Sequence, residues 1–135
     1  MSEKLVLDSF ALVSLYHREP GWQVVQRALY DQEKAGTRAL LSWINWGEFF
    51  YIVKRRVGPA KTIEALRLLE QLPIELCPVD HALVRAAAEI KSEHALSYAD
   101  AFCVATAQRV NATVLTGDPE FESVERLIKI RWLTK

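Results

Sequence analysis

The chain has 135 residues, of which 50% are hydrophobic, so it fits one globular domain that buries roughly two-thirds of its unfolded surface. Lys plus Arg and Asp plus Glu both number 17, so the net charge is zero, which excludes a bulk electrostatic attraction to nucleic acid or to anionic membranes. The apolar stretch after the N-terminal residues is too short for a signal peptide and every longer one is interrupted by charges, so we expect a soluble, cytoplasmic protein without membrane association.

Short β-rich runs alternate along the chain with longer segments of helical periodicity. Strands are predicted at residues 4–7, 39–42, 74–77, 112–116 and 128–132. Helices are predicted at 9–16, 21–35, 45–57, 59–70, 80–93 and 97–110, with a short turn around Phe121. This alternation predicts right-handed crossovers, and hence an α/β fold: a three-layer α/β/α sandwich on a parallel sheet of about five strands. The turn-forming residues between elements predict bends inside a single domain spanning 1–135.

Four carboxylates stand where apolar segments end or helices begin. Asp8 closes the first predicted strand, Asp118 follows the fourth, and Glu48 and Asp100 fall in the first turns of predicted helices. Because strand C-termini and helix N-termini lie along the same edge of such a sheet, all four acids are predicted to meet at one rim. That rim is where open α/β sheets bind ligands.

The negative charges of carboxylates gathered at one rim must be compensated. Two of them about 4 Å apart repel by roughly 4 kcal/mol at an effective dielectric of 20, so protons or cations must be present. Ligands that are all oxygen, without His or Cys beside them, favour Mg²⁺ or Mn²⁺ over Zn²⁺. Such ions can activate water and stabilise the leaving oxygen of a phosphodiester. The acids therefore predict metal-dependent phosphodiester hydrolysis.

Two of the acids also have a purely structural interpretation. Asp8 could cap the first helix, and Asp100 lies three residues after Ser97, which is the spacing of a capping box. For Asp8 we favour ligation, because an acid at the end of an interior strand is costly to desolvate without a partner. Asp100 has apolar neighbours on nearly every side, so it also requires a partner.

The remaining acids also have structural alternatives to metal binding. Glu48 could be a solvated helical residue, but Asn45 three positions earlier places an amide on the same helix face. The segment 116–119 could be only a turn, although the hydroxyl of Thr116 beside Asp118 at a strand end is a more specific combination. Asp80 also follows a strand and opens a helix, and we interpret it as an N-cap, with ligation as the minority alternative.

The basic run Lys54, Arg55 and Arg56 closes the helix that carries Glu48. Cations at a helix C-terminus are favoured by the helix dipole and commonly face solvent. As a weaker alternative, these three residues could bind RNA phosphates.

Four segments together resemble the motifs of PIN-domain ribonucleases, and their order also agrees. They are Leu5-Val6-Leu7-Asp8-Ser9, Asn45-Trp46-Gly47-Glu48, Leu96-Ser97-Tyr98-Ala99-Asp100-Ala101 and Leu115-Thr116-Gly117-Asp118. Within that superfamily the chain is most similar to VapC toxins of VapBC toxin–antitoxin pairs, from Leu5 to about Trp132.

The resemblance implies a ribonuclease that uses Mg²⁺ or Mn²⁺. Asp8, Asp100 and Asp118 match metal-ligand positions, and Glu48 matches the fourth acid, which often acts through water. Thr116, Asn45 and Ser9 match supporting polar positions. Such toxins cleave RNA, usually form homodimers, and are held inactive by a small antitoxin protein.

Two alternatives belong to other functional classes. A receiver-type phosphoacceptor domain would require an adjacent acidic pair and a Lys closing a late strand, whereas here Asp8 is followed by Ser9. A non-catalytic metal-binding, RNA-binding or protein-binding module could keep the acidic rim without turnover. Manganese binding without cleavage of any RNA would identify that module.

Overall fold

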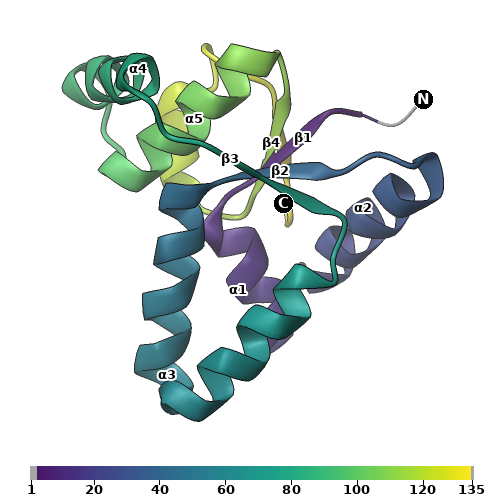
Figure 1. The fold of residues 1–135 in the computed structure, drawn as a ribbon. Coiled ribbons are helices and arrows are strands. Elements are labelled where there is room, and N and C mark those ends of the chain that lie inside the picture. The colour runs from purple at the N-terminus through teal and green to yellow at the C-terminus, as the bar shows by residue number, and fades with distance from the viewer. Residues whose placement is uncertain (1–2, 135) are drawn as a thin grey trace.

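A computed structural model describes residues 3–134 of the chain. Strands and helices alternate through most of it, as predicted (Figure 1). Their order is β1 (Leu5–Leu7), α1 (Ser9–His17), α2 (Trp22–Ala35), β2 (Ala39–Ser42), α3 (Trp43–Glu70), β3 (Ile74–Cys77), α4 (His81–Glu93), α5 (Tyr98–Val110), β4 (Thr113–Thr116), the 3₁₀ helix η1 (Pro119–Val124) and β5 (Ile130–Trp132).

The strands form one parallel sheet in the order β3-β2-β1-β4-β5. The first strand is central: Val6 is in register with Leu40 of β2 and with Val114 of β4. Because β1 and β4 are neighbours and parallel, the residues that follow them emerge side by side at the C-terminal edge of the sheet. The parallel sheet of five strands confirms the predicted α/β class.

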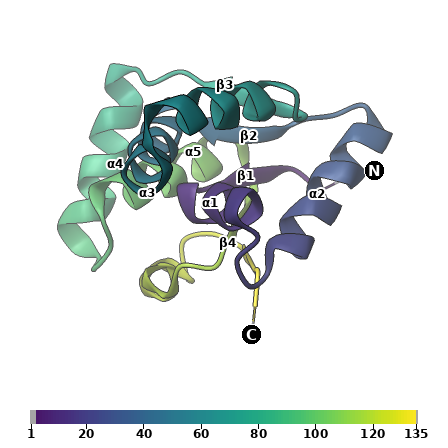
Figure 2. The ribbon, with the colours of Figure 1, turned by 90° about the horizontal axis from the view of Figure 1, so that it is seen from below.

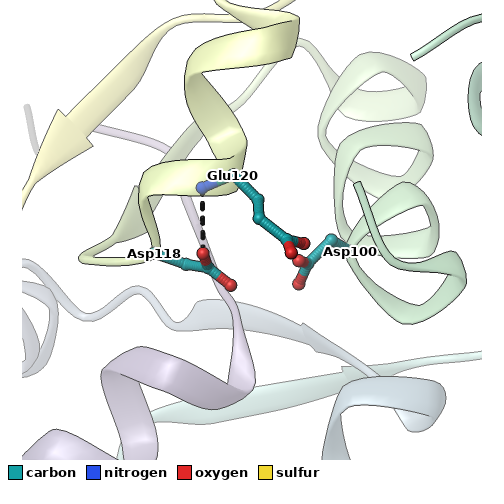
Figure 3. A group of neighbouring side chains, drawn as sticks. All are labelled: Asp100, Asp118 and Glu120. Atoms are coloured by element: carbon teal, nitrogen blue, oxygen red, sulfur yellow. Dashed lines mark hydrogen bonds between the residues drawn. The ribbon is translucent and has the colours of Figure 1, made fainter. Parts of the chain in front are cut away.

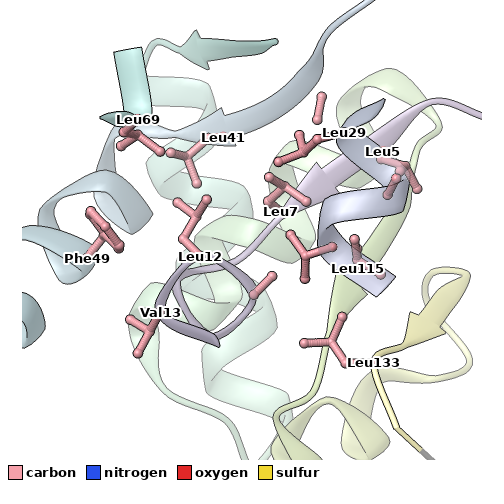
Figure 4. Packing of buried hydrophobic residues seen from close by; sticks show 14 of the residues in the cluster. Leu5, Leu7, Leu12, Val13, Leu29, Leu41, Phe49, Leu69, Leu115 and Leu133 are labelled. Carbon is pink, nitrogen blue, oxygen red and sulfur yellow. The ribbon is translucent and has the colours of Figure 1, made fainter. Parts of the chain in front are cut away.

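Alternating side chains of β1 divide the core between the two faces of the sheet. Leu5 and Leu7 pack with apolar residues of α1, α2 and α3 (Figure 4), whereas Val6 packs with those of α4, α5 and η1. The ribbon shows the same division, with α1 to α3 below the sheet and α4 and α5 above it in Figure 1. Figure 2 views the molecule from below, with α1 and α3 in front of the sheet. The predicted three-layer sandwich is therefore confirmed.

Helix α3 differs from the prediction at its start. The hydroxyl of Ser42 accepts the N–H of Ile44 at 3.2 Å and caps the helix directly at the end of β2, so the helix begins two residues earlier than predicted. Glu48 consequently lies in the second helical turn, and the prediction of the first turn was wrong. Gly58, with φ 84° and ψ 173°, breaks the helical path before Pro59, where the sequence predicted a boundary between two helices. Neither α3 nor any other described helix combines the length and apolar character needed to cross a bilayer.

Candidate functional site

Asp8 is a buried carboxylate with both oxygens engaged. It is only 1% exposed; Oδ1 accepts the N–H of Ala11 at 2.9 Å, and Oδ2 accepts the hydroxyl of Thr116. Asp8 is therefore the N-cap of α1, as its structural interpretation predicted. Burial raises its pKa to about 7, the bonds from Thr116 and Ala11 oppose that rise, and the charges of Asp118 and Glu48 add to it.

Thr116 links Asp8 to Asp118. While its hydroxyl donates to Asp8, the same oxygen accepts the N–H of Asp118 at 3.0 Å. Asp118 in turn caps η1, because its Oδ1 accepts the N–H of Glu120 at 2.9 Å. The segment 116–119 is thus a capped turn that also carries an acid to the end of β4.

Glu48 is held by side chains from two helices. Its Oε1 accepts the hydroxyl of Ser9 at 2.9 Å and the Nδ2 of Asn45 at 3.0 Å. The Nδ2 of Asn45, which is fully buried, also donates to the carbonyl of Ala99 at 3.2 Å, whereas its Oδ1 has no hydrogen-bond partner among residues 3–134. This network confirms that Asn45 and Glu48 share a helix face, and it ties α1, α3 and α5 together at the site.

Asp100 lies in the first turn of α5, as predicted, and is 5% exposed. Its N–H donates to the hydroxyl of the N-cap Ser97 at 3.0 Å. Burial, followed by the charges of Asp8, Asp118 and Glu48, raises the pKa of the Asp100 carboxyl to about 8. The other three predicted acids are therefore close enough to Asp100 to oppose its ionisation.

Three of the four predicted acids line a cleft of about 340 Å³. Glu48, Asp100 and Asp118 line it together with Glu120, and Asp8 lies outside the lining. In the described part of the chain, the ligand oxygens of Asp100, Asp118 and Glu120 approach within 4.8 Å of one another (Figure 3). Asp8 and Glu48 stand outside this tightest group. An all-carboxylate group of this size suits a hard divalent cation.

Glu120 was missed by the sequence reasoning. It is exposed and lies in the segment 118–125, where four spaced acids look like an ordinary surface. The available signal was its position two residues after Asp118 across Pro119, because a Pro that directly follows an N-cap residue marks a helical turn. Such a turn could have been expected to hold Glu120 near the rim.

The other predicted residues lie apart from the acids or at the border of the cleft. Asp80 caps α4 by accepting the N–H of Leu83 at 2.8 Å, and it pairs with Arg109 at 2.6 Å, which lowers its pKa. Of the three basic residues, Arg56 alone lines the cleft, where it pairs with Glu19 at 2.9 Å. Lys54 and Arg55 are exposed outside that lining.

Several solved structures share this fold. VapBC2 from Rickettsia felis, bound to a DNA fragment from its promoter, matches with a TM-score of 0.76 at 16% identity, covering 94% of this chain and 96% of that chain. VapC20 of Mycobacterium tuberculosis, a toxin that cleaves the sarcin–ricin loop, matches with 0.72 at 17% identity, covering 90% and 95%. FitAcB from Neisseria gonorrhoeae matches with 0.66 at 23% identity, covering 93% and 95%.

The sequence comparisons add a family. Among curated proteins no match is found. A family model described as the PIN domain, however, matches residues 5–127. These residues include the four predicted acids, Asp8, Glu48, Asp100 and Asp118. The chain belongs to the PIN domain family.

Proposed function

We propose that this protein is a metal-dependent endoribonuclease that hydrolyses RNA phosphodiester bonds and acts as the toxin of a type II toxin–antitoxin pair. The observation that carries the proposal is that Glu48 of α3, Asp100 of α5 and Asp118 at the exit of β4 line one cleft. Asp8 lies outside that lining but close enough to raise the pKa of Asp100. Membership of the PIN domain family supports nuclease chemistry. The fold shared with the sarcin–ricin-loop toxin VapC20 supports RNA as the substrate class.

The donor set of the cleft fits Mg²⁺ or Mn²⁺. The lining residues include carboxylates and hydroxyls but no His or Cys, and hard cations prefer such oxygen ligands. The raised pKa values of Asp8 and Asp100 support the same assignment, because neighbouring acids add to each rise, whereas a bound cation would favour the ionised carboxylates. Asp8, Asp100 and Asp118 would hold the metal, with Glu48 positioning a second ion or the attacking water.

A bound divalent cation would supply a more acidic water and neutralise charge on the phosphate. The chain itself orients the carboxylates that would bind the cation. Ala11 and Thr116 fix the plane of the Asp8 carboxylate, while Ser9 and Asn45 fix that of Glu48. Such outer hydrogen bonds set the direction and basicity of ligands.

The decisive experiment compares two acids that both cap helices. Wild-type protein should cleave a structured RNA in Mg²⁺, and EDTA should stop the cleavage. Asp8→Asn should keep its cap, because Asn is an equally good N-cap, but it should lose nearly all cleavage. Asp80→Asn is the matched control and should cleave as wild type does. Full activity in a folded Asp8→Asn variant would refute the assignment.

The antitoxin part of the proposal requires a docking surface. A second, larger cavity of about 630 Å³ lies between α1, α2 and the second half of α3. Its lining is mainly apolar and includes Tyr30 and Leu68, which are 55% and 49% exposed. We assign it to an apolar segment of the antitoxin, because similar structures from Salmonella typhimurium and Klebsiella pneumoniae are toxin–antitoxin or VapBC complexes.

Co-expression with the adjacent reading frame tests this assignment. The product of that frame should co-purify with the protein and inhibit its RNA cleavage. Leu68→Glu should release the partner while leaving cleavage by the isolated protein intact, because Leu68 is outside the lining of the acidic cleft. Binding that survives Leu68→Glu would place the partner elsewhere.

We also propose a homodimer. The chain has a mass of 15.4 kDa, so light scattering of the isolated protein should give twice that value. A monomer at every concentration would contradict this part alone.

A further inference from the structure

Helix α5 begins beside the cleft with half of a capping box. In a complete box, the N-cap side chain accepts the N–H of the third helical residue, whose Glu or Gln side chain accepts the N-cap N–H in return. Ser97 is the N-cap of α5, and its hydroxyl accepts the N–H of Asp100 at 3.0 Å. Asp100 occupies the position from which the return bond would come.

The return bond comes instead from a different element. The N–H of Ser97 donates to Oε1 of Glu120 in η1 at 3.2 Å. Glu120 thus takes the place that the Asp100 side chain would have in a self-contained box. Burial raises the pKa of the Asp100 carboxyl, and a hydrogen bond with the Ser97 side chain opposes part of that rise. The Asp100 carboxylate faces Asp118 and Glu120 in the cleft (Figure 3).

Glu120 has a second contact, made through its backbone. Its N–H donates to Oδ1 of Asp118 at 2.9 Å. One residue therefore contacts the acid that follows β4 and the first residues of α5, which carry the acid Asp100. The position is also electrostatically favourable, because a carboxylate at a helix N-terminus interacts well with the helix dipole.

We propose that Glu120 is a positioning residue that caps α5 in place of Asp100, holds the Asp118 turn against that helix and leaves the Asp100 carboxylate for the metal. The inference rests on the proposed function, because it assumes that Asp100 and Asp118 bind a divalent cation. Capping requires only an oxygen acceptor on a side chain of this length. Direct ligation by Glu120 would require its negative charge, so the two roles respond differently to substitution.

Glu120→Gln and Glu120→Ala separate these roles. Gln keeps an acceptor oxygen at the same reach, whereas Ala removes it. Both variants should fold, because η1 is anchored by the buried side chains of Phe121 and Val124 and the Glu120 residue is exposed. Glu122→Ala, an exposed acid on the same short helix, is the matched control.

Two measurements are needed: Mn²⁺ affinity by calorimetry, and hydrogen exchange of the Ser97 amide by NMR. Glu120→Ala should weaken Mn²⁺ binding about 10-fold or more, as expected for loss of an outer-shell partner, whereas Glu120→Gln should stay within about 2-fold of wild type. The Ser97 amide should exchange faster in Glu120→Ala only. Glu122→Ala should change neither quantity.

Other outcomes are informative. Equal loss of Mn²⁺ affinity in Glu120→Gln and Glu120→Ala would mean that the charge is needed, which overturns the positioning role. An equally protected Ser97 amide in both variants would also overturn it. Wild-type protein that neither binds Mn²⁺ nor cleaves RNA would contradict the proposed function, and the exchange of the Ser97 amide would still decide the capping role.

Discussion

The hydroxyl of Thr116 donates to the carboxylate of Asp8, although the two residues are 108 positions apart in the chain. The contact forms because β1 and β4 are parallel neighbours with Leu7 in register with Leu115, so the next residue of each strand emerges at the same level. Asp8 also caps α1. A single buried carboxylate therefore depends on both the sheet register and the start of a helix.

Thr116→Val should test this link. Val has a similar shape but no hydroxyl, so Oδ2 of Asp8 and the N–H of Asp118 would both lose their partner. The pKa of Asp8 should rise further above 7, because the bond from Thr116 lowers it. Loss of the bonds should destabilise the protein by about 1–3 kcal/mol. Carboxyl NMR titration and urea unfolding measure the two effects. Thr116→Ser should restore both, and unchanged values in Thr116→Val would rule out the link.

The raised pKa values of Asp8 and Asp100 predict that the stability of the metal-free protein depends on pH in an unusual way. The pKa values of Asp8 and Asp100 are about 7 and about 8 in the folded protein, against 3.8 ordinarily. Between these values the folded state binds more protons than the unfolded chain. The stability that these two acids contribute is therefore fully present below about pH 4 and is lost as the pH rises through 7 to 8. Urea unfolding in EDTA should therefore give a smaller free energy at about pH 8.5 than at about pH 5.

Asp8→Asn is the control for this pH effect. Asn cannot ionise, so this variant should lose less stability with rising pH, and above neutral pH it should be more stable than metal-free wild type. Mg²⁺ should stabilise wild type more at high pH than at low pH, since it binds the ionised carboxylates. A free energy that increases from pH 5 to pH 8 would refute the raised pKa values.

The element order was predictable because each buried strand is a short apolar run bounded by turn-forming residues. The strands at 39–42 and 74–77 were placed at their observed bounds. The location of Glu120 has no such apolar pattern, and its only sequence signal is Pro119 directly after the N-cap Asp118. It depends on how η1 packs through Phe121 and Val124, which are both fully buried, and such tertiary contacts leave no periodic pattern in a six-residue helix.

The acids show a second limit of sequence reasoning. In the sequence, capping and metal binding are competing interpretations of Asp8 and Asp100. A carboxylate has two oxygens, however, and Asp8 caps α1 with one of them while the other faces Thr116. At the start of α5, the side chain that accepts the Ser97 N–H belongs to Glu120 and not to Asp100. The spacing between Ser97 and Asp100 in the sequence gives no sign of this. Sequence patterns therefore identified the acids but not how their oxygens are shared.

Arg56 should bind RNA more strongly than its basic neighbours. It lies on the same face of α3 as Glu48 and Ile52, at steps of four residues, and all three line the cleft. Arg56→Ala, measured in an Asp8→Asn background to prevent cleavage, should weaken RNA binding several-fold and reduce the salt slope by about 1. Lys54→Ala should change little, because Lys54 is outside the cleft lining.

The partner of Arg56 provides the opposite test. The ion pair with Glu19 is partly exposed to solvent, so it contributes little to stability. Glu19→Gln should remove a negative charge from the cleft lining and leave Arg56 free for phosphate, so RNA should bind more tightly. Equal losses for Arg56→Ala and Lys54→Ala, with no change for Glu19→Gln, would indicate that the basic run acts only through its overall charge.

Gly117 has a steric role between Thr116 and Asp118. A Cβ at this position would collide with the ring of Phe10, which also borders the cleft. Gly117→Ala should therefore displace either the ring or Asp118, lowering stability by about 1–3 kcal/mol and weakening Mn²⁺ binding. Phe10 is 39% exposed, so Phe10→Ala should be tolerated and should remove the collision. The double variant should regain stability and Mn²⁺ affinity relative to Gly117→Ala, and the double-mutant cycle measures this coupling. Strictly additive effects would show that the spacing between Gly117 and Phe10 does not control Asp118.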